Sequence, residues 1–439
     1  MSRQSGTTYQ KVASYEAHPG QIKRVVLLYS GGLDTSVMLK WIKDEYKCEV
    51  IALTVDLGQM ADDLNAIKQK AIKLGAAHAI VIDAKEEFAK NYIAQAIKAN
   101  SCYQGDYHMA TCIGRPLLAK ISVEVAEKYG ADAIAHGCTG KGNDQVRIEA
   151  GILTLAPHMK IIAPVREWAL GREEEIAYAK KHNIPVPTTI EKPYSYDDNM
   201  WGISAEGGEV EDPAKIPPLE KILAHNVTAE KAPNEGLTLV IDFEKGLPIA
   251  LNGKKMSLVN LVLELNNIGG KHGIGTTIHI EDRLVGLKIR DIYEAPAAHI
   301  LIKAHKSLEK IVSTREENFE KVHIDEKWSY LCYGAKWYEP LMKSLNAFID
   351  SINEKVTGKV TVKLYKGVAT VVAINSPYSL FNANLATFMK SSAFNQNASA
   401  GFIEIYSLES KTACQIAYAN GRKQGRVKKV SHIAKTAVR

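Results

Sequence analysis

Short apolar runs alternate with stretches of helical spacing over the first 185 residues, and this alternation restricts the fold more than any other feature. The apolar runs predict strands at residues 25–29, 50–56, 79–83, 131–136 and 160–163. The helical stretches predict helices near residues 35–43, 62–74, 86–99, 115–129 and 173–182. Strands that are apolar along their whole length indicate a parallel sheet covered by helices on both faces. We therefore expect a doubly wound α/β domain, whose ligands bind beyond the carboxyl ends of the strands.

Three prolines, Pro185, Pro187 and Pro193, end this alternation of strands and helices and predict a hinge. The residues before the first strand are polar, and we expect them to form a disordered leader. The expected organisation is a polar leader, a parallel α/β domain, an α+β domain and a C-terminal helical tail, over residues 1–21, 22–185, 186–390 and 391–439.

The expected α+β domain carries antiparallel signals. Two pairs of alternating apolar segments predict hairpins, at residues 237–243 with 247–251 and at 360–364 with 368–372. Helical spacing over residues 258–268 predicts a helix that ends at Gly269 and Gly270.

The formal net charge of +6 belongs mainly to the C-terminus. No acidic residue follows Glu409, and removing the eight lysines and arginines from Lys411 onward leaves a net charge of about −2. We expect a tail that is solvated or contacts another subunit, and we do not expect a nucleic-acid-binding face.

The six cysteines show no Cys-x-x-Cys spacing, so the sequence predicts free thiols in a reducing cytoplasm rather than a zinc site or a disulfide framework. No apolar run approaches the roughly 18 residues that a membrane helix needs. The first residues also lack the apolar core of a secretory signal. A cytoplasmic protein without a membrane span is expected.

A glycine turn, residues 30–36, joins the first predicted strand to the first predicted helix. Its adjacent glycines allow the backbone to approach a polyanion, and the helix dipole adds a favourable field. We expect the first-turn amides of Asp34, Thr35 and Ser36 to face that anion, together with the hydroxyls of Ser30, Thr35 and Ser36. No lysine follows the glycines, so the loop differs from the Gly-x4-Gly-Lys-Ser/Thr nucleotide loop, and it is not Gly-x-Gly-x-x-Gly either.

The Ser-Gly-Gly-x-Asp-Ser/Thr pattern of this turn resembles the pyrophosphate-binding loop of the ATP pyrophosphatase group. That group includes argininosuccinate synthase, asparagine, GMP and NAD synthetases, and tRNA thiolases. The resemblance implies ATP as a substrate, with Mg²⁺ bound alongside it. We identify no protein ligand for a metal.

A second dense segment, residues 136–147, follows the predicted strand 131–136 and so lies at the same edge of the sheet. A free amino acid needs an anionic partner for its ammonium group and cationic or amide donors for its carboxylate. Asp144 and Arg147 offer those two partners within four residues. The segment therefore predicts an amino-acid site next to the phosphate loop.

This segment closely resembles the His-Gly-x-Thr-Gly-Lys-Gly-Asn-Asp-x-x-Arg signature of the argininosuccinate synthase family. Further matches to the family occur in order, at residues 56–59, 111–116, 193–199, 201–204, 270–275, 281–283, 292–296 and 376–380. The resemblance covers about residues 22–410.

The family resemblance implies a role for each matching residue. Its ATP contacts fall on Tyr29, Ser30, Gly31, Gly32, Leu33, Asp34, Thr35, Ser36, Val55, His136, Gly137, Cys138, Thr139, Gly140, Lys141, Gly142, Asn143 and Asp144. Its aspartate contacts fall on Thr139, Asn143 and Asp144, and Asp144 is also the candidate for orienting the aspartate amine. Its citrulline contacts fall on Tyr107, Cys112, Asn143, Arg147, Ser195, Ser204, Glu281 and Tyr293.

Two positions depart from the family pattern. Cys112 stands where serine or alanine is common, and it is either a substrate contact or a small buried residue. Asp291 replaces a residue that is usually glycine, and we expect it to alter the local backbone.

The resemblance implies a ligase that joins citrulline to aspartate in arginine biosynthesis, cleaving ATP to AMP and pyrophosphate through a citrullyl-AMP intermediate. It also implies a nucleotide-binding domain followed by a synthetase domain, in a homotetramer whose C-terminal helix reaches a neighbouring subunit.

Three other functions remain open from the residues alone. A tRNA thiolase shares the phosphate loop but normally needs a catalytic cysteine pair or an added RNA-binding domain, and neither is visible. Asparagine and GMP synthetases carry a glutamine-hydrolysing domain, for which there is no room before residue 25. A protein that senses ATP or binds RNA without turnover is disfavoured by the intact Asp144, Arg147 and Glu281.

Overall fold

A parallel sheet forms the N-terminal part of the computed structural model, which describes residues 9–60, 63–168, 172–185, 193–387, 389 and 393–423. The strands of this sheet are β1 (Arg24–Leu28), β2 (Glu49–Asp56), β3 (His78–Asp83), β4 (Ala133–Ala135) and β5 (Lys160–Ile162). All five predicted strands are therefore confirmed. Their order is β3-β2-β1-β4-β5, so the chain reverses its direction of winding between β1 and β4. A doubly wound sheet binds its ligands beyond the carboxyl ends of the strands at this point.

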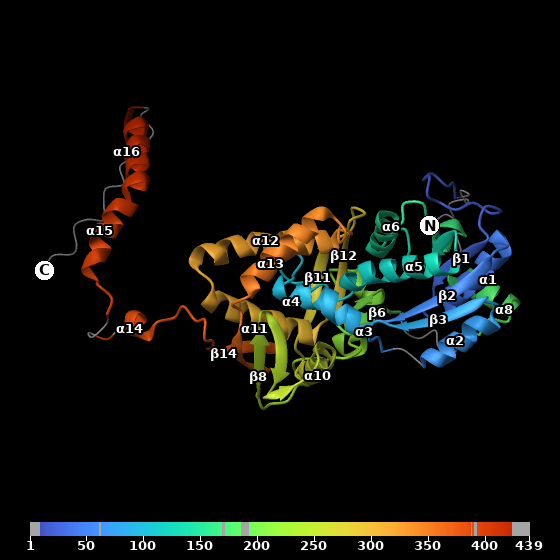
Figure 1. Ribbon diagram of the computed structural model, residues 1–439, viewed down its shortest axis with the longest axis horizontal. Coiled ribbons are helices and arrows are strands. Elements are labelled where there is room, and N and C mark those ends of the chain that lie inside the picture. The colour runs from blue at the N-terminus through green and yellow to red at the C-terminus, as the bar shows by residue number, and fades with distance from the viewer. Residues whose placement is uncertain are drawn as a thin grey trace. The chain divides into compact units, whose positions relative to one another are not determined.

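Helices cover both faces of this sheet (Figure 1). The helices of this region are α1 (Leu33–Tyr46), α2 (Leu64–Lys73), α3 (Lys85–Phe88), a π-helical turn (Ala89–Ile93), α4 (Ala94–Lys98), a 3₁₀ turn (Cys112–Gly114), α5 (Arg115–Tyr129), α6 (Asn143–Leu155), α7 (Pro164–Glu167) and α8 (Arg172–Lys181). Side chains alternate along β1: Val25 and Leu27 pack in one apolar cluster with α1 and α2, whereas Val26 packs in another with α5 and α6. Burial on both faces is why residues 25–28 of the strand are all apolar.

Two features of this domain differ from the sequence prediction. Helix α1 begins at Leu33, two residues earlier than expected, and the segment 136–147 contains the start of α6 at Asn143. The sequence analysis predicted no helix over residues 143–155, because the glycines and polar residues of the segment hide the helical spacing that follows.

The polar leader is not disordered where the structure describes it. Ala17 is fully buried, and its amide donates to the carbonyl of Ile161 on β5 at 2.9 Å. Glu16 forms a parallel bridge with the same residue. The expectation of disorder is therefore wrong for residues 9–21, because this stretch pairs with the edge of the sheet; residues 1–8 lie outside the described part of the chain.

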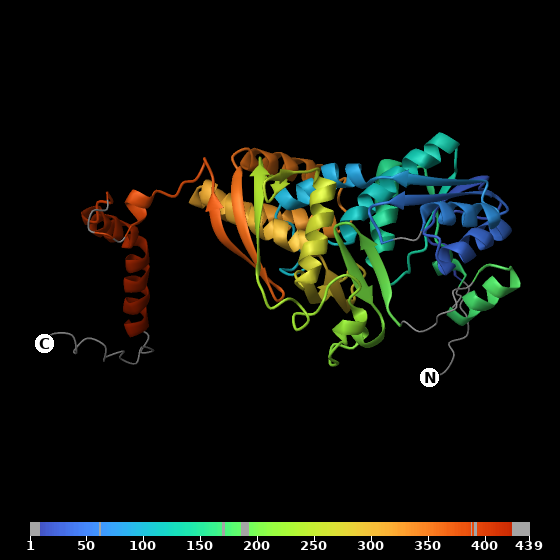
Figure 2. The same cartoon turned by 90° about the horizontal axis from the view of Figure 1, so that it is seen from below.

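Two antiparallel sheets make up most of the following region. The first has the order β10-β9-β8-β13-β14 and contains β8 (Leu237–Glu244), β9 (Leu247–Leu251), β10 (Lys254–Lys255), β13 (Gly358–Tyr365) and β14 (Val368–Asn375). Both predicted hairpins are confirmed within it, and β8 also pairs with β13 although the two are distant in sequence (Figure 2). The second sheet, which the sequence did not predict, has the order β11-β12-β7-β6 and contains β6 (Ser195–Asn199), β7 (Gly202–Glu206), β11 (Thr276–Asp282) and β12 (Lys288–Glu294).

The helices of this region only partly match the prediction. Helix α10 (Leu258–Lys271) continues through Gly269 and Gly270, so the predicted end is wrong. A Cβ atom at Gly269 would lie 2.7 Å from the Cβ of Pro296, so the glycine allows close packing against α11 (Pro296–Val312) rather than ending α10. The remaining helical elements were not predicted, and they are a 3₁₀ turn (Gly208–Glu211), α9 (Leu219–Ile222), α11 (Pro296–Val312), α12 (Arg315–Tyr333) and α13 (Pro340–Asn353).

The chain forms two compact units, Met1–Ser379 and Leu380–Arg439. The second contains α14 (Ala383–Ala386), α15 (Asn397–Tyr406) and α16 (Leu408–Lys423), so the expected C-terminal helix is present. Many apolar side chains of α15 are exposed, including Phe402 and Ile405. The basic residues from Arg426 onward lie outside the described residues, as does Pro187 of the predicted hinge. Among the described residues, no helix is long and apolar enough to cross a membrane.

Candidate active site

The phosphate loop connects β1 to α1 at the point where the sheet reverses its winding. Gly31 has a φ of +82°, a conformation that suits glycine, and Gly32 is the N-cap of α1. The first-turn amides that point out of the helix therefore belong to residues 33–35. The hydroxyls of Ser30 and Thr35 lie 3.2 Å apart at the exposed mouth of the loop. Backbone and side-chain donors thus converge on one side of the turn, as anion binding requires.

Ser36 faces the opposite way. Its amide donates to the carbonyl of Gly32 at 3.1 Å, and its hydroxyl donates to the same carbonyl at 2.6 Å. Ser36 is fully buried beside the hydroxyl of Tyr29. The expectation that the Ser36 amide faces the anion is wrong, because α1 starts earlier and turns this amide into an ordinary helical donor. Lys70 of α2, which sequence reasoning missed, donates to the carbonyl of Gly31 at 2.7 Å.

Residues 136–142 lie against the phosphate loop. A Cβ atom at Gly137 would lie 2.8 Å from Cε of Met38 on α1, so a larger residue here would displace the end of the Met38 side chain. His136 is buried and its ring points away from the loop, toward Glu149. The carbonyl of Val55, an expected ATP contact, accepts a hydrogen bond from Gln59 Nε2 at 3.0 Å.

Asp144 sits in the first turn of α6 between two guanidinium groups. Its carboxylate accepts hydrogen bonds from Arg115 at 2.7 Å and from Arg147 at 2.9 Å. Although burial acts in the opposite direction, these two cations hold the pKa of Asp144 well below its usual range. Asp144 and Arg147 were predicted to bind opposite ends of an amino acid, yet here they contact each other. A carboxylate held in this way stays ionised and does not accept a proton near neutral pH.

Asn143 and Arg147 are held by a tyrosine from α12. Asn143 donates to the Tyr333 hydroxyl at 2.7 Å and accepts from the Leu284 amide at 2.7 Å. Arg147 donates to the Tyr333 carbonyl at 3.0 Å, and its guanidinium lies 4.6 Å from the Tyr333 ring centroid. Tyr333 therefore orients two predicted substrate residues.

The expected citrulline residues are placed by the second antiparallel sheet. In its register, Ser204 of β7 pairs with Tyr293 of β12. The Tyr293 hydroxyl donates to Glu281 at 2.8 Å, and its ring stacks on that of Tyr107 with centroids 4.1 Å apart. Ser195 begins β6, the neighbouring strand.

An acidic cluster surrounds Arg283 at this end of the pocket. Arg283 contacts Glu206 at 2.8 Å, Asp291 at 3.5 Å and Glu281 at 3.7 Å. Burial raises the pKa of Asp291 to about 8, and the charges of Glu206 and Glu281 add to this effect. The expectation that Asp291 alters the local backbone is wrong, because it sits in a regular ladder opposite His279. Its effect is to place an acidic group inside the pocket.

These groups line one pocket of about 340 Å³. The predicted residues that line it are Asp34, Tyr107, Gly137, Cys138, Thr139, Gly142, Asn143, Asp144, Arg147, Ser195, Ser204, Glu281 and Tyr293. The predicted residues that do not line it are Tyr29, Ser30, Gly31, Gly32, Leu33, Thr35, Ser36, Val55, Cys112, His136, Gly140 and Lys141. Cys112 is fully buried and its amide donates to the Tyr107 hydroxyl at 3.3 Å. It therefore contacts Tyr107 without lining the pocket itself.

Five lining residues were given no role by sequence reasoning: Thr111, Asp197, Glu206, Arg283 and Asp291. Three of them follow from strand periodicity, since residues two apart on a strand face the same side. Asp197 is two residues from Ser195, Glu206 is two from Ser204, and Asp291 is two from Tyr293. The sheet that carries them was not predicted, so this signal was not available.

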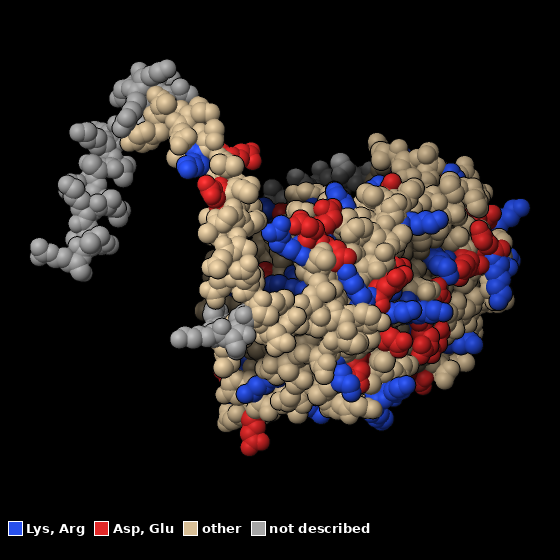
Figure 3. All heavy atoms as spheres, turned by 60° about the vertical axis from the view of Figure 1, so that its left-hand side comes forward, with Lys and Arg blue, Asp and Glu red and all other residues tan. Residues whose placement is uncertain are grey.

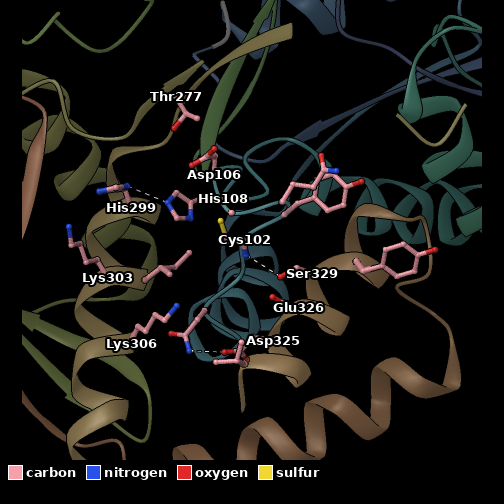
Figure 4. Close-up of a pocket in the computed structure, with 17 residues that line it drawn as sticks. Cys102, Asp106, His108, Thr277, His299, Lys303, Lys306, Asp325, Glu326 and Ser329 are labelled. Atoms are coloured by element: carbon pink, nitrogen blue, oxygen red, sulfur yellow. Dashed lines mark hydrogen bonds between the residues drawn. The ribbon is translucent and has the colours of Figure 1, made fainter. Parts of the chain in front are cut away.

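A second hollow of about 610 Å³ lies between α11, α12 and residues 102–108 (Figure 4). His299, Lys303 and Lys306 line it from α11, and the rings of His108 and His299 are joined at 3.3 Å. It contains none of the phosphate-loop residues or those of segment 136–147. The smaller pocket is therefore the candidate active site.

The described residues contain no group of three or more histidine, cysteine, aspartate or glutamate side chains arranged to hold a metal ion. A divalent cation at this site would therefore depend on the oxygens of a bound polyphosphate for most of its ligands.

A parallel sheet with a lysine-free phosphate loop, next to a pocket of paired charges that suits amino acids, defines an ATP-dependent ligase. Residues 24–185 match the family model described as "Arginosuccinate synthase N-terminal HUP domain", and residues 194–413 match the one described as "Arginosuccinate synthase C-terminal domain". The chain belongs to the argininosuccinate synthase family, which confirms the resemblance seen in its motifs.

Individual relatives agree with this assignment. The chain is 52% identical over 390 residues to the argininosuccinate synthase of Pyrococcus furiosus, covering 89% of this chain and 94% of that protein. It is 50% identical over 387 residues to that of Dictyoglomus turgidum, covering 88% and 96%. A U34-tRNA thiolase structure from Methanococcus maripaludis is 18% identical with a TM-score of 0.25, covering 39% of this chain and 60% of that one. That last likeness carries no weight in the assignment.

Proposed function

We propose that this chain makes argininosuccinate from citrulline and aspartate by way of a citrullyl-AMP intermediate, releasing pyrophosphate and then AMP. The observation that carries the proposal is the adjacency of two sites. Asp34 of the phosphate loop and Asp144 of the amino-acid pocket line the same 340 Å³ hollow. A nucleotide held by the loop therefore has its inner phosphate next to a bound amino acid.

The proposed ATP site uses the loop at residues 30–36 for the β- and γ-phosphates. Its donors lie at a helix N-terminus, where the dipole favours the charge that builds up on departing pyrophosphate. Residues 136–142 close over the nucleotide from the neighbouring strand. Mg²⁺ would accompany the phosphates and neutralise part of their charge.

Adenylation solves a chemical difficulty, because a ureido carbon resists direct attack by an amine. The ureido oxygen of citrulline attacks the α-phosphorus, an O–P bond forms, and the bond from the α-phosphorus to the bridging oxygen breaks to release pyrophosphate. The amine of aspartate then attacks the ureido carbon. The C–O bond breaks, AMP leaves with the former ureido oxygen, and the amine loses its proton.

The residues of the pocket bind and orient the two amino acids in this proposal. Glu281 faces the citrulline ammonium group, while Tyr107 and Tyr293 confine the side chain. Asp144 orients the aspartate amine as a fixed anion, since its two guanidinium partners keep it ionised. We expect Asp144 to act on the rate mainly by positioning the aspartate amine and not by transferring a proton.

A role in nucleic-acid binding is not supported by the body of the chain. On the face shown in Figure 3, lysine and arginine side chains intermingle with aspartate and glutamate, and no continuous basic area appears. All six cysteines are free, which fits the proposed cytoplasmic location.

We also propose a homotetramer in which α15 and α16 contact a neighbouring subunit. Phe402 and Ile405 of α15 are 63% and 71% exposed within one chain, which supports an apolar contact there. Phe402→Glu combined with Ile405→Glu should lower the mass found by light scattering from that of four chains. Ala400→Glu, an exposed position on the same helix, is the matched control, and an unchanged mass in the double variant would rule out this contact.

Pyrophosphate release tests the proposed reaction. ATP is incubated with the enzyme and with citrulline, aspartate, asparagine or glutamine, each alone and in pairs. The proposal expects release that needs citrulline, and argininosuccinate only when aspartate is also present. Release that is independent of citrulline would reject it.

A further inference from the structure

Asp197 is a carboxylate of the active-site pocket that the proposed reaction does not use. It lies on β6, two residues after Ser195, and residues two apart on a strand face the same side. In the sheet register it pairs with Ser204 of β7, which also lines the pocket. Asp197 is therefore part of the same pocket wall as two expected citrulline contacts.

Asp197 and Asp144 share one hydrogen-bond donor. The Nη2 atom of Arg115 donates to Oδ2 of Asp144 at 2.7 Å and also to Oδ2 of Asp197. Each carboxylate is thus one hydrogen bond away from the same nitrogen, and both carboxylates line the pocket. A substrate amine that Asp144 orients is therefore next to Asp197 as well.

The two carboxylates differ in how many of their oxygens are occupied. Asp144 accepts from Arg147 through Oδ1 and from Arg115 through Oδ2, so each of its oxygens has a guanidinium partner. Asp197 accepts from Arg115 through Oδ2, whereas its Oδ1 receives no hydrogen bond from any residue that the structure describes. The Asp197 side chain is 38% exposed in the empty pocket. A proton from a bound amine therefore has a free oxygen to go to on Asp197 but not on Asp144.

The electrostatic surroundings also distinguish the two groups. Burial raises the pKa of Asp197 to about 6, so this carboxylate is ionised near neutral pH and can still accept a proton. The other charges that act on it are that of Arg115, which lowers this pKa, and those of Asp144, Asp198 and Glu206, which raise it. Burial also raises the pKa of the nearby Cys138 thiol, so that group stays neutral. Two neighbouring carboxylates whose pKa values are shifted in opposite directions are typical of acid–base sites.

The remaining carboxylates of the pocket are less suited to accept this proton. Burial raises the pKa of Asp291 to about 8, so its carboxyl group is already protonated near neutral pH. Glu206 and Glu281 contact Arg283 at 2.8 and 3.7 Å, at the end of the pocket expected to hold citrulline. The aspartate of the phosphate loop lies on the nucleotide side. Asp197 alone among these groups combines an ionised state and a free oxygen with a place beside the expected aspartate amine.

We infer that Asp197 is the general base of the second half-reaction: its carboxylate takes a proton from the ammonium group of bound aspartate before the amine attacks. This inference rests on the proposed function. An N–H bond of the ammonium group breaks and an O–H bond forms on Asp197, which frees the nitrogen lone pair. That lone pair forms the bond to the ureido carbon, and the electron pair of the C–O bond leaves with AMP. The second proton of the nitrogen goes to the departing AMP phosphate, and Asp197 releases the first to solvent.

The test uses Asp197→Asn in the full chain, which keeps the shape of the side chain and removes its ability to accept a proton. We expect kcat for argininosuccinate to fall by about a hundredfold to ten-thousandfold, as the loss of a general base does, while KM for aspartate rises by under about tenfold. Citrulline-dependent exchange between ATP and pyrophosphate should stay within about twofold, which also shows that the variant is folded.

Asp198→Asn is the matched control, because Asp198 follows on the same strand and does not line the pocket. It accepts from the Met60 amide at 2.6 Å, and the asparagine oxygen can keep that bond. Neither kcat nor the exchange rate should change by more than about threefold in this control.

The pH dependence distinguishes a base from a structural group. Asp197 cannot accept a proton below its own pKa, so kcat/KM for aspartate in the unaltered enzyme should rise with pH and level off above about 6. In Asp197→Asn this acidic limb should disappear, and the rate should instead keep rising at alkaline pH as the amine loses its proton to solution. Asp198→Asn should keep the acidic limb.

Three results would overturn the inference: an unchanged kcat in Asp197→Asn, an acidic limb that persists in this variant, or the absence of that limb from the unaltered enzyme. Loss of exchange in parallel with kcat would also overturn it, because Asp197 would then act before aspartate reacts. Citrulline-dependent pyrophosphate release by the unaltered enzyme, measured in the same preparation, tests the proposed function on its own.

Discussion

Asp144 illustrates how a residue predicted from local sequence acquires its properties from distant partners. Its place three residues before Arg147 was visible in the motif, but its second partner, Arg115, comes from another helix. The pKa of Asp144 follows from this pairing and not from the motif itself. At this scale the sequence identified chemically relevant residues, whereas their protonation and mutual contacts required the fold.

Asp144→Asn tests the role of the fixed charge while keeping the shape of the side chain. KM for aspartate should rise by about tenfold to a hundredfold, because an interaction with a charged group is lost. Citrulline-dependent exchange between ATP and pyrophosphate should persist. Steady-state and exchange kinetics measure the two steps separately. An unchanged KM for aspartate would remove Asp144 from the aspartate site.

Asp291 makes stability depend on pH. The pKa of Asp291 in the folded state, about 8, exceeds that of an unfolded aspartate. The contribution of this group to the free energy of unfolding is therefore fully present below about pH 4 and is lost as pH rises through about 8. Asp291→Asn removes the ionisation, so the variant should gain stability relative to the natural enzyme between pH 5 and 9, by about 1 kcal/mol or more. Melting temperatures at pH 5, 7 and 9 measure this. Parallel curves for the two proteins would contradict the assignment.

Most elements of the first domain were predictable because each carries its own signal, although α6 was missed. The strand β1, the glycine turn and α1 form one local unit, and its existence needed no knowledge of the rest of the chain. The sheet β11-β12-β7-β6 was missed because its strands contain mixed charges, such as Asp197 and Glu206, that serve the pocket instead of a core. Helix α12 was missed as well, so Tyr333 could not be placed.

Two glycines of the unit from β1 to α1 have different roles: we expect Gly32 to matter for nucleotide binding and Gly31 for stability. A Cβ atom at exposed Gly32 would meet only Ser30 Oγ, at 3.5 Å, whereas at Gly31 it would lie 2.9 Å from Ile67 in a backbone of positive φ. Gly32→Ala should therefore lower the exchange between ATP and pyrophosphate by about tenfold or more while costing under about 1 kcal/mol of stability. Gly31→Ala should cost about 1–2 kcal/mol. Denaturant melts and exchange assays measure both; full exchange activity in Gly32→Ala would contradict the loop assignment.

The whole molecule brings a parallel sheet and an antiparallel sheet to one pocket. Asp34 and Thr139 reach it from the first, while Ser204 and Tyr293 reach it from the second. The family match over residues 24–185 and 194–413 accounts for both halves, and the part of the leader that pairs with β5 lies outside that match. Sequence reasoning predicted two domains that share a site, but not the ordered leader, because its polar residues carry no strand signal.

Transfer of the ureido oxygen tests the central claim most directly. Citrulline labelled with ¹⁸O in its ureido group is converted with ATP and aspartate, and the products are analysed by mass spectrometry. If the pocket brings that oxygen to the α-phosphorus, the label will appear in AMP. Label found in inorganic phosphate or pyrophosphate, with AMP unlabelled, would contradict the account.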